Sequence, residues 1–119
     1  QVSMVVSGAG GDKMEAALKQ ALKNQESAPK IMKDTDFETM AEVARSMEPD
    51  ILIGNSKGYY IARELKIPIV RVGFPIHDRI GGQRILHVGY AGTQQLFDRI
   101  TNALLEYKQE NSPIGYKYL

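Results

Sequence analysis

Short apolar runs alternate with amphipathic stretches along the whole chain. The β-branched run at 2–6 predicts a first strand, and 30–33 predicts a short edge strand. The continuous apolar run at 50–54 is typical of a strand covered on both faces, and 68–73 predicts the next strand. A further short extended piece is expected at 85–88.

Between the strands, apolar residues recur at helical spacing. Asp12 is placed to cap the first helix, and Thr35 with Glu38 has the spacing of a capping box for the second, which Pro49 ends. The helices are expected at 12–22, 35–48, 60–66 and 92–108.

This rhythm of strand and helix predicts a mostly parallel sheet with right-handed crossovers. We therefore expect a three-layer, Rossmann-like α/β domain over residues 1–119, with a C-terminal tail at 109–119. The chain starts at Gln1 and is already in an apolar alternation by Val2, which suggests a piece of a longer polypeptide.

Composition narrows the classes of function. The chain has 119 residues, of which 24% are charged, and its net charge of +1 gives no field that favours nucleic acid or a membrane surface as a partner. Cysteine is absent, so the chain offers no disulfide, no thiolate nucleophile and no cysteine ligand for an iron–sulfur cluster. With two histidines, an all-protein zinc site is not expected.

Two glycine-rich turns follow predicted strands. The first, 8–11, has Lys13 where a dinucleotide-binding fingerprint needs its third glycine, which favours a plain tight turn. The second, 54–58, lacks the spacing of a phosphate-binding loop, so a helix cap by Asn55 or Ser56 is favoured. Contact of this second turn with a partner or ligand stays open, because it lies at the sheet edge where ligands usually bind.

The segment 71–90 holds the strongest group of chemically active side chains. Arginines offer paired donors to carboxylates, and histidine is a donor or a metal ligand. The alternative is that Asp78 pairs with Arg79 or Arg84 and that the histidines satisfy loop carbonyls. Composition alone does not choose between these interpretations, and no catalytic triad or carboxylate pair is visible. The group consists of His77, Asp78, Arg79, Arg84 and His87.

Three motifs, in this order and spacing, resemble the nitrogenase component 1 family, which comprises the molybdenum–iron protein subunits and their cofactor-assembly scaffold homologues. They are Asp50-Ile51-Leu52-Ile53-Gly54-Asn55-Ser56-Lys57-Gly58, the run from Ile67 to Arg79 that contains Gly73-Phe74-Pro75, and Val88-Gly89-Tyr90-Ala91-Gly92-Thr93. Within that family, the chain looks like the C-terminal Rossmann-like domain of a three-domain, β-type subunit.

The resemblance implies a cytoplasmic heterotetramer with an α-like subunit, which serves nitrogen fixation and carries an iron–sulfur cluster and an iron–molybdenum cofactor precursor. The fragment alone is expected to bind no cofactor and to have no activity, with no nucleic acid or membrane as a partner. The loop residues implied to line a cofactor or partner interface are His77, Arg79 and Arg84. The residues implied at the subunit interface are Asn55, Ser56, Phe74, Asp78 and Tyr90.

Three functions follow as expectations. The loop 81–84 and the ending 112–116 favour a β-like subunit of the scaffold on which the iron–molybdenum cofactor is assembled. The alternatives are the C-terminal domain of the catalytic molybdenum–iron protein β subunit and a free-standing nucleotide-binding Rossmann domain. The metal variant and any fusion to another module stay open.

Overall fold

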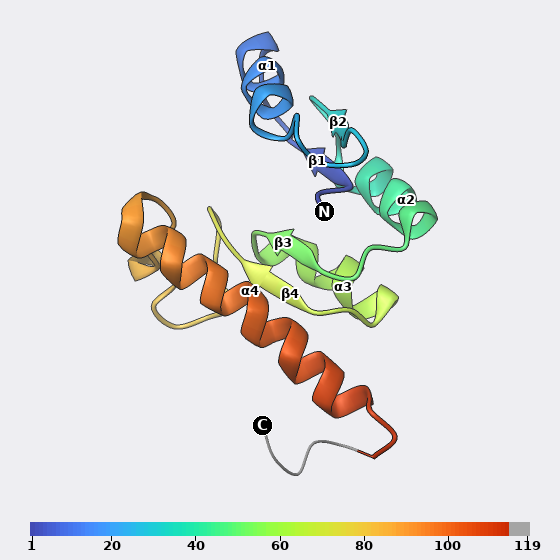
Figure 1. The fold of residues 1–119 in the computed structure, drawn as a ribbon, viewed down its shortest axis with the longest axis vertical. Helices are drawn as coiled ribbons and strands as arrows, with labels where there is room; N and C mark the ends of the chain where they lie inside the picture. The colour runs from blue at the N-terminus through green and yellow to red at the C-terminus, as the bar shows by residue number, and fades with distance from the viewer. Residues whose placement is uncertain (115–119) are drawn as a thin grey trace. The chain divides into compact units, whose positions relative to one another are not determined.

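The computed structural model describes residues 1–114. The chain divides into two compact units, Gln1–Pro49 and the part from Asp50 onward. Each unit repeats the same order, with a strand, a helix, a parallel strand and a second helix, as Figure 1 shows. The fold is therefore an α/β, Rossmann-like fragment built on parallel strands, which confirms the predicted fold class.

In the first unit, β1 (Met4–Val6) pairs in parallel with β2 (Lys30–Met32), and Val5 lies opposite Ile31. Helix α1 (Asp12–Ala21) connects the two strands, as a parallel pair requires, and α2 (Phe37–Met47) follows them. Both strands fall within the predicted ranges 2–6 and 30–33.

The start of α1 differs from the prediction. Gly11 occupies the N-cap position without a side-chain bond, and Asp12 is the first helical residue, so the predicted cap by Asp12 is wrong. The Asp12 carboxylate lies 3.0 Å from Lys33 Nζ, which Glu15 also contacts at 2.8 Å. Lys33 thus holds two carboxylates at the positive end of the α1 dipole, where negative charge is stabilising.

This cluster predicts an acid-sensitive step in stability. Hydrogen bonds from Lys19 and then Lys33 lower the pKa of Glu15 from 4.5 to about 2. A depressed carboxyl pKa adds stability above its ordinary value, and that stability is lost as the pH falls toward 2. Glu15→Gln should therefore flatten the fall in melting temperature between about pH 5 and pH 2. Glu26→Gln, an exposed site in the same unit, is the matched control, and equal pH profiles for both variants would contradict the account.

Helix α2 is capped one residue later than expected. The Asp36 carboxylate accepts from the Thr39 backbone N–H at 2.8 Å, whereas the Thr35 hydroxyl donates to the Lys33 carbonyl. The predicted Thr35–Glu38 capping box is therefore wrong, because an aspartate inside the motif takes the N-cap position. The helix ends at Met47, one residue before the left-handed Glu48.

In the second unit, β3 (Leu52–Gly54) pairs in parallel with β4 (Ile69–Arg71). A 3-10 turn at Ser56–Gly58 leads into α3 (Tyr59–Leu65) between the strands. After β4 the chain forms a long loop that contains a 3-10 turn at Gly82–Arg84 and then enters α4 (Gly89–Asn111).

Three details of this unit differ from the sequence analysis. Residues 85–88 form no strand, and α4 begins at Gly89 and runs to Asn111, so 109–111 are helical. Ile53 keeps 49% of its surface exposed, so the described chain covers one face of β3 only in part, contrary to expectation. Residues 115–119 of the predicted tail lie outside the described residues. The prediction of one domain over 1–119 stays a prediction.

Small and branched residues form the buried apolar core. In the second unit these come from α3, β4 and the loop, namely Ile61, Ala62, Val70 and Ile76, and in the first unit they are Ala41 and Ala44 on α2. Across residues 1–114, no helix combines the length and the apolar character needed to cross a membrane.

Candidate functional site

A buried ion pair organises the loop that follows β4. Arg71, the last residue of β4, is 8% exposed. Its Nε lies 2.9 and 3.0 Å from the two carboxylate oxygens of Asp78, and its Nη2 lies 2.7 Å from Oδ2. This paired geometry is the strong form of the arginine–carboxylate interaction. The Tyr59 ring, with its centroid 5.7 Å from Arg71 Cζ, adds a cation–π contact.

Ser56 joins the turn after β3 to this ion pair. Its buried hydroxyl donates to Asp78 Oδ1 at 2.6 Å and accepts from the His77 backbone N–H at 3.1 Å. The Ser56 backbone N–H donates to the Pro75 carbonyl at 3.0 Å. The turns that leave β3 and β4 are therefore held together at one edge of the sheet. We call Arg71, Asp78 and Ser56 the loop latch.

The loop latch keeps Asp78 ionised. Hydrogen bonds from Arg71, and then from Ser56, hold the pKa of the Asp78 carboxyl well below its usual range. The stability that this carboxylate contributes is present above its ordinary pKa and is lost only as the pH falls into the acid range. An aspartate in this state does not act as a general base or acid near neutral pH.

The partner of Asp78 is not the one expected from the sequence. Arg79 reaches the Asp78 carboxylate only at 3.6 Å, and the Arg84 guanidinium lies beside Gly81 instead. The true partner, Arg71, belongs to the same segment 71–90, but the sequence pattern does not predict its pairing with Asp78. A signal for this pairing exists, because a buried arginine inside an apolar strand requires a counterion.

The three residues predicted to line a cofactor or partner surface do not converge. His77 is exposed, and Arg79, whose side chain is 58% exposed, donates from Nη1 to the Asp78 carbonyl at 2.6 Å. Arg84 lies in the 3-10 turn and folds back over Gly81, where an added Cβ would stand 2.9 Å from Arg84 Nη2. Their role at a cofactor or partner stays a prediction.

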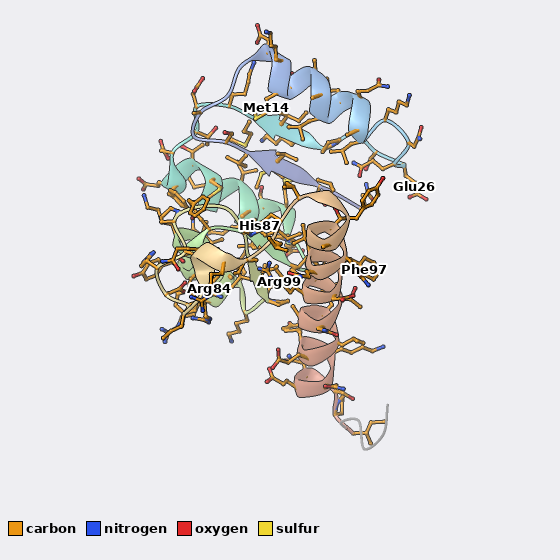
Figure 2. All side chains as sticks on the ribbon, turned by 90° about the vertical axis from the view of Figure 1, so that its left-hand side faces the viewer. Met14, Glu26, Arg84, His87, Phe97 and Arg99 are labelled. Carbon is orange, nitrogen blue, oxygen red and sulfur yellow. The ribbon has the colours of Figure 1, made fainter. Side chains whose placement is uncertain are left out.

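The other histidine has a different environment. His87 precedes α4, and its Nε2 is buried with no hydrogen-bond partner among the described residues. The expectation that the histidines satisfy loop carbonyls is therefore wrong for this nitrogen. Figure 2 places His87 and Arg84 at separate points of the loop.

The residues predicted at an interface fall into two groups. Ser56 and Asp78 are internal parts of the loop latch, and Asn55 caps the turn after β3. Phe74 and Tyr90, in contrast, are 75% and 100% exposed. They belong to a set of open apolar side chains along the loop and its exit, completed by Ile80, Leu86 and Val88.

The side chain of Asn55 caps the 3-10 turn at Ser56–Gly58, and two substitutions test what this cap contributes to stability. Its side-chain oxygen accepts from the Lys57 backbone N–H at 3.1 Å, and its Nδ2 donates to the Phe74 carbonyl at 3.3 Å. Asn55→Ala should destabilise the protein by about 1 kcal/mol, the usual cost of losing a cap. Asn55→Asp keeps the acceptor and should recover most of that loss in chemical unfolding. Equal losses for the two variants would show that the cap is not the stabilising contact.

The donor set does not fit a metal cluster. Within residues 1–114, no group of three or more histidine, cysteine, aspartate or glutamate side chains gathers at one point. The sequence holds no cysteine, and the Asp78 carboxylate is already bound to Arg71 and Ser56. The described residues therefore provide no set of ligands for an iron–sulfur cluster.

The glycine turn of the first unit is equally unsuited to a dinucleotide. The N-terminus of α1 carries the carboxylates of Asp12 and Glu15, both bonded to Lys33. A pyrophosphate at this position would lie beside those negative charges, which oppose its binding although no side chain caps the first N–H groups of the helix. The geometry favours the plain tight turn between a strand and a helix.

Comparisons with known proteins point to one family. The family model described as Nitrogenase component 1 type Oxidoreductase matches residues 1–105. The chain is 45% identical over 75 residues to a nitrogenase molybdenum-iron protein beta chain of Methanothermobacter thermautotrophicus, which is 63% of this chain and 16% of that one. It is 40% identical over 76 residues to the nitrogenase iron-molybdenum cofactor biosynthesis protein NifN of Bradyrhizobium diazoefficiens, which is 64% of this chain and 16% of that one.

A solved structure gives the same result for the fold. The structure described as "Nitrogenase Cp1 at pH 6.5" superposes with a TM-score of 0.88 and 32% sequence identity, over 98% of this chain and 26% of the other. A beta chain of Methanococcus maripaludis is 32% identical over 103 residues, which is 87% of this chain and 22% of that one. The chain thus spans between about a sixth and a quarter of the length of these relatives.

Proposed function

Because the chain belongs to the nitrogenase component 1 type oxidoreductase family, we propose that it is part of a β-type subunit that serves nitrogen fixation. In this role, the loop after β4 forms a contact surface for an α-type subunit in a cytoplasmic heterotetramer. The cofactors of the intact complex are then an iron–sulfur cluster and an iron–molybdenum cofactor precursor, held by residues outside this chain.

The loop latch carries this proposal. The strongest polar interaction in the loop fixes the backbone, because Arg71 binds Asp78 on both oxygens and Ser56 ties Asp78 to the neighbouring turn. The latch leaves Phe74 and Tyr90 open on the outside. Exposed aromatic side chains on a rigid support are characteristic of protein interfaces, where tyrosine and phenylalanine are enriched.

Within the family we favour the cofactor-assembly scaffold. The support is the Gly81-Gly82-Gln83-Arg84 loop, which resembles that of the scaffold subunit, and NifN, at 40% identity, is among the similar proteins. The second candidate is the catalytic β subunit, which is favoured by the 45% identity to a molybdenum-iron protein beta chain. Both roles use the same fold and the same loop surface.

One experiment separates the two roles. The full-length subunit is copurified anaerobically with its α-type partner, its iron and molybdenum are measured, and acetylene reduction is assayed with the reductase component. The scaffold predicts bound iron, negligible turnover and transfer of cofactor activity to an apo-nitrogenase. Robust acetylene reduction would overturn the scaffold role in favour of the catalytic one.

The loop arginines provide a finer test of the same proposal. Arg79→Ala and Arg84→Ala in the full-length subunit should impair partner assembly or cofactor maturation more than folding, because Arg84 does not contact Asp78 and Arg79 reaches its carboxylate only at 3.6 Å, so the Arg71–Asp78 pair stays in place. Arg63→Ala on α3 is the matched control. A loss of melting temperature for both loop variants as large as their loss of assembly would assign them a structural role.

A further inference from the structure

A cavity between β4 and α4 lies beside the loop latch. It has a volume of about 440 Å³, and an adjoining cavity of about 510 Å³ shares part of its lining. Its walls combine apolar and charged side chains, including Val70, Ile85, Arg71, Arg79, Arg99 and Glu106. This space is of the size that small ligands occupy, and it runs alongside β4 from Ile69 to Arg71.

The most informative residue in the cavity is Arg99 on α4. Its Nη2 donates to the carbonyl of Arg71, so the guanidinium is held toward β4. Figure 2 shows Arg99 and Phe97 on opposite sides of α4. The Nη1 of Arg99 is buried and has no hydrogen-bond partner within residues 1–114. A buried donor in this state is costly, and because this nitrogen has almost no accessible surface of its own, it meets an acceptor in the cavity only if the guanidinium turns toward it.

The charges around the cavity are not balanced. Three guanidinium groups, from Arg71, Arg79 and Arg99, line it together with the Glu106 carboxylate. Asp78 neutralises Arg71, so the remaining charges are two positive and one negative. One excess positive charge therefore remains beside these apolar walls.

From these observations we propose that the cavity between β4 and α4 binds a small carboxylate through Arg79 and Arg99. A carboxylate supplies the single negative charge that balances the cavity and two acceptor oxygens that match the donors of a guanidinium. The apolar side chains Ile69, Val70, Ile85 and Ala103 surround the carbon end of the ligand. Arg79 also belongs to the loop surface of the proposed function, whereas Arg99 on α4 belongs to this cavity, so the effect of Arg99→Gln on binding tests the cavity separately.

The test measures binding to the full-length subunit by calorimetry at constant ionic strength. Succinate is the probe, inorganic phosphate tests whether another oxyanion serves instead, and chloride is the control for ionic strength. Succinate should bind saturably at a single site, and Arg79→Gln and Arg99→Gln should each weaken it by about tenfold or more. Arg63→Gln, on α3 outside the cavity, should leave binding unchanged.

Several results would overturn the proposal. These are no saturable binding of succinate, tighter binding of phosphate than of succinate, and succinate binding that both arginine variants leave intact. Because Arg99 also braces the Arg71 carbonyl, its replacement can disturb folding. Arg79→Gln then decides, since that side chain is 58% exposed and its removal leaves the Arg71–Asp78 pair in place.

Discussion

Asp78→Asn should lower the melting temperature of the full-length subunit by about 5 °C or more. The substitution keeps the shape of the side chain but removes the charge that balances Arg71, which is 8% exposed. A buried arginine without a counterion is strongly unfavourable, because the guanidinium has lost its hydration and no nearby negative charge compensates for that loss. The Ser56 hydroxyl would also lose its charged acceptor, so both turns at this edge of the sheet should loosen.

Two further measurements test the same ion pair. Arg71→Met should cost less than Asp78→Asn, because the Asp78 side chain is 29% exposed and regains water, whereas Arg71 does not. The melting temperatures of Asp78→Asn and the unchanged protein should also converge as the pH falls into the acid range, where the depressed pKa of Asp78 is finally reached. If the two variants lowered the melting temperature equally, and at every pH, the Arg71–Asp78 pair would not be the stabilising contact of the loop latch.

Gly92→Ala should destabilise the subunit although it replaces glycine inside a helix. A Cβ at Gly92 would stand 2.9 and 3.0 Å from the backbone C and N atoms of His87. Alanine ordinarily gains about 1 kcal/mol over glycine in a helix, but overpacking costs about 1–3 kcal/mol and backbone atoms cannot rotate away. We expect a net loss of about 1–2 kcal/mol in chemical unfolding.

Gly54→Ala is the matched control for this prediction. A Cβ at Gly54 meets no atom within 4 Å, and the residue lies in the same unit of the chain. Its replacement should be neutral or slightly stabilising, because glycine is the less favoured residue inside a strand. If Gly92→Ala were as stable as Gly54→Ala, the close approach of α4 to the segment before it would be wrong.

The sequence predicted the elements better than it predicted their contacts. Apolar runs located the four strands found within residues 1–114, together with one at 85–88 that does not form, because burial demands branched apolar residues whichever neighbours they meet. Helix starts were less well predicted, since Asp12, Thr35 and Asp36 all have side chains that cap helices. Only the path of the backbone decides which of them reaches a free N–H group, and that path depends on contacts distant in sequence.

The same limit applies to the candidate site. The segment 71–90 contains the Arg71–Asp78 ion pair, but the sequence pattern does not predict that these two residues pair. Arg79 is the neighbour of Asp78 in sequence, whereas Arg71 is its neighbour in space because the loop folds back onto the end of β4. The buried Nη1 of Arg99 could not be foreseen either, since it depends on how α4 packs beside β4.

The most direct test of the account is whether the outer side of the loop holds the α-type subunit. Phe74→Ser and Tyr90→Ser are combined in the full-length subunit, and the amount of α-type subunit that copurifies is measured against the unchanged protein. The matched control is Tyr60→Ser, since Tyr60 is 78% exposed on α3. The account predicts at least a tenfold loss of copurified partner at an unchanged melting temperature, a size typical of aromatic interface anchors. A full yield of partner with the double variant would contradict the proposed contact surface.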